Sequence, residues 1–231
     1  MNPADLSVIV PVYNGARFLR DAIASVTAQG FAPMQIIIVD DGSTDDTPAV
    51  VRSLAGPIHS VRQENHGPSS ARNLGIRAAR TEMLAFIDAD DLWPTDKLAH
   101  QVPVLAADRS IDVVMGYTQA VSPAGSEPIH GRQLSLSVGA SLFRRSAFER
   151  YGFFDESFRA GEDLDWLLRA REAGARIDLV NTVTLLYREN PGSLSHGKSH
   201  AELNFFRILK RSLDRRREEG VDLAPLRRPA S

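Results

Sequence analysis

The sequence of 231 residues is 43% hydrophobic, which is enough for a large core, and we expect a single α/β domain. Its 27 lysine and arginine residues nearly balance 29 aspartate and glutamate residues, so the overall charge does not favour a nucleic-acid partner. The absence of cysteine excludes disulfides and thiolate metal ligands.

No segment of the sequence has the features of a membrane anchor. The apolar stretches fall short of the roughly 20 residues that a membrane-spanning helix needs. The first residues lack the basic start and the apolar run of a signal peptide. We therefore expect a cytoplasmic protein, and peripheral contact with the inner face of a membrane stays open.

Strand-like and helical patterns alternate in the first part of the chain. Apolar runs predict strands at residues 6–12, 35–39, 58–61 and 83–87. Apolar residues at helical spacing predict helices at residues 19–26, 44–54 and 69–80, the second with Thr44 or Asp45 as its N-cap. This alternation predicts a parallel, doubly wound sheet, in which ligands bind beyond the carboxyl ends of the strands.

The second part of the chain is less regular. A helix expected at residues 94–107 contains Pro103, which should kink it or end it early. Residues 122–132 are rich in turn-forming residues and predict a loop. The remaining patterns predict strands at 111–117, 139–143, 177–180 and 183–187, and helices at 145–151 and 161–174.

Three carboxylates, Asp88, Asp90 and Asp91, follow the apolar strand at 83–87. Like charges this close raise the pKa of at least one carboxyl unless a cation or hydrogen-bond donors compensate them. The alternative is a solvated turn in which an aspartate caps the next helix. Because both glycine-rich phosphate-binding motifs are missing, a metal ion on these aspartates is the candidate for holding a nucleotide phosphate.

Short motifs follow one another in a distinctive order along the chain. They are Ser7-Val-Ile-Val-Pro-Val-Tyr-Asn14, Val39-Asp-Asp-Gly-Ser-Thr-Asp45, Ala71-Arg-Asn-Leu-Gly75, Phe86-Ile-Asp-Ala-Asp-Asp-Leu-Trp93, Gly152-Phe-Phe-Asp-Glu156, Gly161-Glu-Asp163, Tyr187-Arg188 and Pro191-Gly-Ser-Leu-Ser195. In this order and spacing they resemble the family 2 inverting glycosyltransferases. The resemblance implies the GT-A fold, a Rossmann-like α/β fold in which helices flank a mainly parallel central sheet. It implies a nucleotide-binding half at about 1–93 and an acceptor half at about 94–200. A tail rich in basic residues follows at 201–231.

The resemblance implies that the aspartates bind a divalent metal ion that grips the diphosphate of a nucleotide-sugar. Asp90 is then the first metal contact, and Asp88 reaches the metal or the ribose, with Ala89 between them at the donor. Mn²⁺ or Mg²⁺ suits a site built from oxygen ligands. Asp91 is either a supporting hydrogen-bond acceptor or the N-cap of the next helix.

Five further positions match donor-binding residues of the family. The resemblance places Tyr13 and the backbone of Pro11 and Val12 against the nucleotide base, with Asp40 accepting a hydrogen bond from the base. Arg72 matches an arginine near the base and the diphosphate, and a cation facing phosphate is sound chemistry. The alternatives are ordinary packing for Tyr13 and a solvated helical arginine for Arg72.

Asp163 matches the catalytic base of the family. An inverting transfer needs a carboxylate that takes the proton from the acceptor hydroxyl as it attacks the anomeric carbon. The charge of Glu162 raises the proton affinity of Asp163, whereas the helix N-terminus lowers it, and the sequence leaves the net sign open. The alternative is that both acids only complement the helix dipole.

Three other side chains are candidates without a settled role. Trp166 and Trp93 either line an acceptor pocket or pack in the core. His196 lies in a segment that closes over the diphosphate in related enzymes, where it would contact metal or phosphate.

The basic tail predicts an amphipathic helix with Phe205, Leu209 and Leu213 on one stripe. One interpretation places this helix on an anionic membrane surface, where it would meet a lipid-linked acceptor. The alternative, which we favour, is a helix that docks onto the domain through that stripe.

Taken with the resemblance, these features predict an inverting, metal-assisted transfer of a sugar to an acceptor hydroxyl. The expected donor is a nucleotide-diphospho-sugar, with a UDP-sugar preferred, and the expected acceptor is a carbohydrate or a lipid-linked molecule of bacterial-type polysaccharide, glycolipid or glycoconjugate synthesis. A nucleotidyltransferase would instead open with a glycine-rich loop, where Val10–Gly15 stands here. A calcium loop at residues 40–47 fails the required pattern. A catalytically silent sugar-nucleotide binder would lack Asp90 or Asp163, and both are present.

Overall fold

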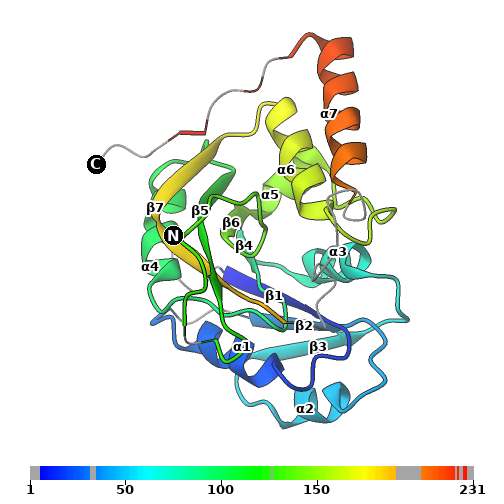
Figure 1. The fold of residues 1–231 in the computed structure, drawn as a ribbon, viewed down its shortest axis with the longest axis vertical. Coiled ribbons are helices and arrows are strands. Elements are labelled where there is room, and N and C mark those ends of the chain that lie inside the picture. The colour runs from blue at the N-terminus through cyan, green and yellow to red at the C-terminus, as the bar shows by residue number, and fades with distance from the viewer. Residues whose placement is uncertain are drawn as a thin grey trace.

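The structure, a computed structural model, describes residues 6–31, 35–125, 127–190, 204–221, 223 and 226–227. Within these residues the strands form a seven-stranded sheet in the order β3-β2-β1-β4-β6-β5-β7 (Figure 1). The strands are β1 (Leu6–Val12), β2 (Gln35–Asp40), β3 (Ile58–Arg62), β4 (Met83–Phe86), β5 (Val113–Val121), β6 (Ser141–Arg144) and β7 (Ile177–Arg188).

The first four strands are parallel, as the alternating pattern predicts. β1 pairs with β2 and with β4, and β2 pairs with β3. Further along the sheet, β6 is antiparallel to both β4 and β5, and β7 is parallel to β5. The carboxyl ends of these strands, apart from that of β6, therefore lie at the same edge of the sheet.

Helices cover both faces of the sheet. One apolar core lies under α1 (Leu19–Thr27), α2 (Thr47–Ser53) and α4 (Lys97–Ala107), and the other lies under α3 (Pro68–Ala78), α5 (Arg145–Tyr151) and α6 (Glu162–Glu172). Side chains alternate along β1, so that Val8 and Val10 enter the first core and Ile9 enters the second. All residues of β1 are buried, which explains its continuous apolar sequence.

The start of α2 differs from the prediction, because neither Thr44 nor Asp45 is its N-cap. The helix begins at Thr47, after Asp46. The backbone N–H of Thr44 donates to the side chain of Asn14 at 2.8 Å, and Oδ1 of Asp45 accepts the N–H of Thr47 at 2.9 Å. These bonds keep both residues in the loop that leads from β2 into the helix.

Helix α4 begins at Lys97, later than the predicted residue 94, and Pro103 does not end it. Proline has no N–H to offer the carbonyl of Ala99, but both residues lie on the exposed side of the helix, where water can solvate that carbonyl. Leu98 and Leu105, on the buried side, continue the contact with the core past the proline.

Strand β7 is continuous, whereas the sequence predicts two strands at 177–180 and 183–187. It pairs with β5 over most of its length, and a register shift near Tyr117 accommodates the residues between the predicted strands. β5 is correspondingly longer than the predicted 111–117 and reaches Val121. The pairing between the two strands, which sequence periodicity does not report, sets their length.

The C-terminal helix α7 (Phe205–Glu219) docks onto the domain, as we favour from the sequence, and Leu209 of the expected stripe packs against the docking cluster, but the centre of the contact is Ile208. Ile208 and Ser212 are buried on it, and Ile208 packs against Phe158 and Leu168. Leu213, expected on the docking stripe, is 44% exposed.

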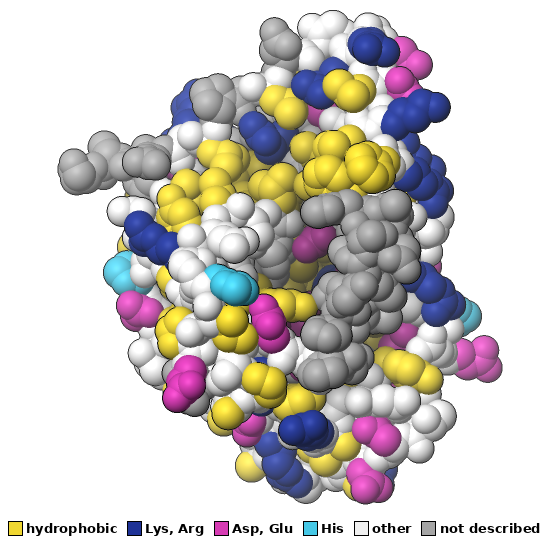
Figure 2. All heavy atoms as spheres, viewed as in Figure 1, with side chains coloured by type: hydrophobic (Ala, Val, Ile, Leu, Met, Phe, Trp, Pro, Cys, Tyr) yellow, Lys and Arg dark blue, Asp and Glu magenta, His cyan; other side chains and the backbone are white. Residues whose placement is uncertain are grey.

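Ion pairs to the rest of the domain hold α7 in place. Arg215 pairs with Glu172 at 2.5 Å, and Arg211 pairs with Asp155 at 2.9 Å. Figure 2 shows basic side chains over the outer surface of this helix. None of the described helices is both long enough and apolar enough to span a membrane.

Candidate active site

The residues predicted to bind a donor gather at the edge of the sheet where β1, β2 and β4 end. Tyr13 directly follows β1, and its side chain is 51% exposed. Asp40 ends β2 opposite Val12, and Asp88 comes shortly after the end of β4. The backbone of Pro11 and Val12 is part of β1 itself. Three separate parts of the sequence thus converge at one edge, as the parallel arrangement predicts.

The loop after β1 is fixed by polar contacts with the loop after β2. Asn14 has a positive φ of 51°, and its N–H donates to Oγ of Ser43 at 3.0 Å. The N–H of Gly15 donates to Oγ1 of Thr47 at 2.9 Å. A Cβ on Gly15 would lie 2.6 Å from Cγ2 of Val12, so only glycine fits there. These contacts fix the backbone that directly follows Tyr13.

Asp40 is buried and already has two hydrogen-bond partners. Its Oδ1 accepts the N–H of Ser43 at 2.8 Å, and its Oδ2 accepts Nη1 of Arg62 at 2.6 Å. Sequence reasoning missed Arg62, although the last residues of two adjacent strands, Asp40 and Arg62, face each other in register. Any ligand group that binds Asp40 would therefore meet Arg62 as well.

The neighbouring carboxylate, Asp41, has a local structural role. It accepts the N–H of His66 at 3.0 Å and the N–H of Gly67 at 2.8 Å. Asp41 therefore holds the connection between β3 and α3, the helix that carries Arg72.

The three aspartates after β4 have different surroundings. The side chain of Asp88 is 45% exposed. Burial and the charge of Asp88 raise the pKa of Asp90 above its usual value. Burial and the charges of Asp88 and Asp90 raise the pKa of Asp91 well above its usual value. The crowding of like charge expected from the sequence is therefore present.

Asp91 links this loop to β7 and does not cap a helix. Its Oδ1 accepts the N–H of Arg188 at 3.0 Å, and Leu92 and Leu186 exchange two backbone hydrogen bonds next to it. Helix α4 starts only at Lys97, so the alternative of an N-cap at Asp91 is wrong.

The aspartates fit a hard divalent cation that also binds a ligand. Within the described residues, no group of three or more histidine, cysteine, aspartate or glutamate side chains is arranged to hold a metal ion. Mg²⁺ and Mn²⁺ commonly bind one or two carboxylates and complete their shell with phosphate and water. Asp88 and Asp90 supply that number of carboxylates, and a cation there would relieve the repulsion that raises the pKa of Asp90.

Arg72 lies between the aspartate loop and the start of α6. It is buried on α3, its Nη2 donates to Oδ1 of Asp88 at 2.6 Å, and its Nη1 donates to Oε1 of Glu162. Burial acts to lower the pKa of Arg72, but the charges of Asp88, Glu162 and Asp163 raise it, so the guanidinium stays charged. The sequence alternative of a solvated arginine is therefore wrong.

Asp163 stands in the first turn of α6, next to the Arg72–Glu162 pair. Its Oδ1 accepts the N–H of Leu164 at 2.8 Å. Burial and the charge of Glu162 raise the pKa of Asp163 to about 7. The direction left open by the sequence is thus upward, because burial and like charge outweigh the helix N-terminus. A carboxyl with a pKa near neutrality suits a general base.

Trp166 does not line an acceptor pocket, because its side chain is fully buried. It packs against Phe143 and Phe148, and its Nε1 donates to the carbonyl of Gly152 at 2.6 Å. Trp93, 3% exposed, also belongs to the core. His196 lies outside the described residues.

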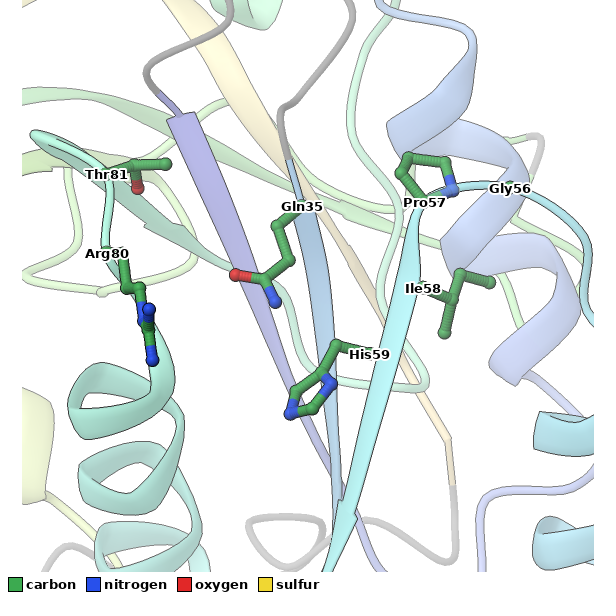
Figure 3. A pocket seen from close by; sticks show the side chains of 7 residues that line it. All are labelled: Gln35, Gly56, Pro57, Ile58, His59, Arg80 and Thr81. Carbon is green, nitrogen blue, oxygen red and sulfur yellow. The ribbon is translucent and has the colours of Figure 1, made fainter.

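A separate pocket lies at the opposite edge of the sheet. Figure 3 shows Gln35 and Ile58 lining it at the starts of β2 and β3, together with His59, Arg80 and Thr81. These positions are at the amino ends of the parallel strands, away from the carboxyl ends where Asp40 and Asp88 lie.

Curated proteins similar to this chain include uncharacterized glycosyltransferases and a succinoglycan biosynthesis protein. The uncharacterized glycosyltransferase EpsJ of Bacillus subtilis is 31% identical over 216 residues, covering 82% of this chain and 62% of EpsJ. The succinoglycan biosynthesis protein ExoU of Rhizobium meliloti is 28% identical over 228 residues, covering 84% of this chain and 65% of ExoU. An uncharacterized glycosyltransferase of Rickettsia felis is covered over only 37% of its length. The chain is thus shorter than these relatives.

Solved structures share the fold over nearly the whole chain. S. aureus TarS 1–349 in complex with UDP-GlcNAc has a TM-score of 0.77 at 20% identity, covering 97% of this chain and 68% of TarS. The mannosyltransferase PcManGT of Pyrobaculum calidifontis, in complex with GDP-Man and Mn²⁺, has a TM-score of 0.67 at 23% identity, covering 97% of this chain and 67% of PcManGT. The GT-A fold expected from the motifs is confirmed.

A family model connects the sequence motifs with this fold. The model described as Glycosyl transferase family 2 matches residues 7–155, which is most of the chain and includes β2, which ends in Asp40, and β4, which precedes Asp88. The predicted resemblance is therefore confirmed, and the chain belongs to glycosyl transferase family 2.

Proposed function

We propose that this protein transfers a sugar, with inversion, from a nucleotide-diphospho-sugar to an acceptor hydroxyl. The observation that carries the proposal is the chain of contacts from Asp88 through Arg72 to Glu162, because it places an Asp-x-Asp pair and the carboxyl of Asp163 at one edge of the sheet. Such an edge is where ligands of parallel α/β sheets bind.

Asp163 is the proposed general base. Its carboxylate takes the proton of the acceptor hydroxyl as that oxygen bonds to the anomeric carbon, and the bond to the diphosphate breaks on the opposite face. A pKa of about 7 makes this carboxyl basic enough to hold the proton and still largely ionised above neutral pH. Glu162, paired with Arg72, is not free for this task.

Asp88 and Asp90 are the proposed holders of Mn²⁺ or Mg²⁺, and Ala89 lies between them at the donor. When bound, the cation neutralises charge that develops on the leaving diphosphate. PcManGT, a structural neighbour, was solved with Mn²⁺. Its presence there supports a divalent cation for this chain as well.

A UDP-sugar is the preferred donor, with Tyr13 stacking on the base. Tyr13 is exposed at the end of β1, and Asp40 and Arg62 lie beside that end on the next strands. TarS was solved with UDP-GlcNAc and PcManGT with GDP-Man, so both bases must be tested. The name of ExoU supports polysaccharide synthesis, with a carbohydrate or lipid-linked acceptor.

Contact with an anionic membrane is a further part of this proposal. The outward face of α7 carries Phe206, which is 65% exposed, and Leu213, which is 44% exposed, with Lys210 and Arg217 at neighbouring turns. Apolar and basic side chains on one helical face favour binding to anionic lipid. The F206S/L213S variant should lose co-sedimentation with anionic vesicles, and absence of binding by the wild type would contradict the proposal.

Donor binding is tested by thermal unfolding with UDP-, GDP- and dTDP-sugars, each with Mn²⁺, Mg²⁺ or chelator. A ligand present at a hundred times its dissociation constant stabilises the native state by about 2.7 kcal/mol, which is readily measured. We expect a metal-dependent shift with a UDP-sugar, and loss of that shift in Asp90→Asn. The exposed Asp96 offers a matched control, because Asp96→Asn should keep the shift.

Transfer itself is tested by the anomeric configuration of the product. An inverted configuration, with loss of transfer in Asp163→Asn at unchanged nucleotide binding, supports the assigned roles. A retained configuration, or full transfer by Asp163→Asn, would contradict the mechanism.

A further inference from the structure

Arg72 connects two acidic parts of the site that are far apart in sequence. One Nη group donates to Asp88, beyond β4, and the other donates to Glu162, in the first turn of α6. The side chains of Arg72 and Glu162 are 5% and 7% exposed, so this pair is desolvated. In Figure 1, α3 and α6 lie on the same side of the sheet, which is what allows a side chain of one helix to reach the other.

We infer that Arg72 is a positioning residue, which holds Asp88 and Glu162 at a fixed separation, and not a ligand of the donor diphosphate. This inference rests on the proposed function. It assigns to Arg72 a task different from the phosphate contact that the sequence motif implies.

The arrangement of donors on the guanidinium supports this role. The fork of Arg72 is planar, and its two Nη groups serve two separate carboxylates, which a lysine ammonium cannot do with the same geometry. Its Nε has no hydrogen-bond partner within the described residues and is buried. The two carboxylates take up two of the five N–H groups of Arg72. The side chain is only 5% exposed, so a phosphate would reach the guanidinium face only by displacing Asp88 or Glu162, and breaking a buried ion pair is strongly destabilising.

The same contacts give the adjacent acids Glu162 and Asp163 different roles. Glu162 is neutralised by Arg72, whereas Asp163 forms no ion pair within the described part of the chain and keeps a carboxylate available for a proton. At the other end, Arg72 occupies Oδ1 of Asp88 and leaves Oδ2, on a side chain that is 45% exposed, for the donor side. Arg72 therefore sets the distance between Asp88, on the side of the donor, and the Glu162–Asp163 pair, on the side of the general base.

The test compares Arg72→Lys and Glu162→Gln with the wild type. Arg72→Lys keeps the charge but loses the fork, and a displacement of about 1 Å costs about 10²-fold in rate, so kcat should fall by about that factor. The dissociation constant of UDP measured with Mn²⁺ should change much less than kcat in both variants, because Arg72 does not contact the diphosphate itself. Glu162→Gln keeps an acceptor for Nη1, so it should remain folded, and its kcat should fall as well.

Direct phosphate contact would give the opposite pattern. Arg72→Lys would keep kcat, because lysine also binds phosphate, and Glu162→Gln would tighten UDP binding by releasing Arg72. Either result would overturn the inference. The matched control is Arg77→Lys on the same helix, where the exposed Arg77 lies 4.0 Å from Glu156 and should tolerate the change.

A melting-temperature cycle keeps this test separate from the proposed function. If the wild type neither binds nucleotide nor transfers sugar, the proposed function is refuted. The melting temperatures would still test the ion pair between Arg72 and Glu162. If Arg72 and Glu162 act as one pair, the loss of melting temperature in the double variant should be smaller than the sum of the two single losses. A double variant whose loss of melting temperature equals the sum of the two single losses would overturn the inference.

Discussion

Oδ1 of Asp91 accepts the backbone N–H of Arg188 at 3.0 Å, and this bond ties the aspartate-rich loop to the end of β7. Strand β4 and strand β7 are not neighbours in the sheet, since β6 and β5 lie between them. The bond therefore spans the end of the sheet and fixes the loop that carries Asp88 and Asp90 from both sides.

Asp91→Ala should destabilise the protein more than Asp91→Asn. Alanine leaves the buried N–H of Arg188 without a partner, which costs about 1–3 kcal/mol in the free energy of unfolding. Asparagine keeps an acceptor oxygen and removes the carboxyl group of Asp91, whose pKa is raised chiefly by burial. Urea unfolding at pH 8 measures the difference. Equal losses in the two variants would show that the charge of Asp91, and not the hydrogen bond, matters.

Activity should rise with pH through neutrality. The pKa of Asp163 is raised to about 7, so the carboxylate that accepts the proton is the minor form below this pH and the major form above it. Removing a general base lowers the rate by about 10²–10⁴-fold. We therefore expect kcat/KM to rise between pH 6 and 8 at fixed free metal concentration. A flat profile would contradict the assignment of Asp163.

Glu162→Gln should move this rise to lower pH. The charge of Glu162 is, after burial, the second cause of the raised pKa of Asp163, and the substitution removes it. The shift is read from the same kcat/KM profile. An unchanged midpoint would show that burial alone sets the pKa.

Stability should respond to pH in the opposite sense. Between the usual value of 3.8 and about 7, the folded protein holds a proton on Asp163 that the unfolded chain releases. The contribution of Asp163 to the free energy of unfolding therefore decreases as pH rises through this window. Asp163→Asn should remove that decrease, measured by urea unfolding between pH 5 and 8. The same slope in wild type and variant would contradict the raised pKa.

Gly75→Ala should disturb the site from a distance. A Cβ at Gly75 would lie 2.4 Å from Cγ2 of Ile9, so α3 must move away from β1. Overpacking of this kind costs about 1–3 kcal/mol, and α3 carries Arg72, so both stability and kcat should fall. The control is Gly131→Ala, because nothing lies within 4 Å of its added Cβ. Comparable effects of the two substitutions would argue against the close approach of α3 to β1.

The parallel strands and the edge that carries the carboxylates could be predicted, because both depend on local signals. The apolar run before Asp88 and the alternation of strands with helices place these residues at carboxyl ends whatever the rest of the chain does. The family motifs then identify Asp163, whose raised pKa is in line with the role predicted from them.

The contacts that define the site could not be predicted, since they depend on packing between distant elements. Arg72 and Glu162 are 90 residues apart and meet only because α3 and α6 share one face of the sheet. The burial of Trp166 and the choice of the α7 residues that dock likewise depend on which neighbours cover them. Arg62 is an exception, because the register of β2 and β3 would have revealed it.

The antiparallel strand β6 has a consequence for exchanging parts between related enzymes. It pairs with β4, so the sheet runs without interruption past residue 93, where the sequence suggests a division. The rings of Phe86 and Phe143, from the two sides of that division, meet edge to face with centroids 5.5 Å apart. A chimera joined near residue 93 would take the two rings from different enzymes and disturb this contact. The acceptor half therefore cannot be exchanged as an independent unit to change acceptor specificity. The loop between β5 and β6 is the better graft site, because its exchange leaves the seven strands and the pairing of β4 with β6 intact.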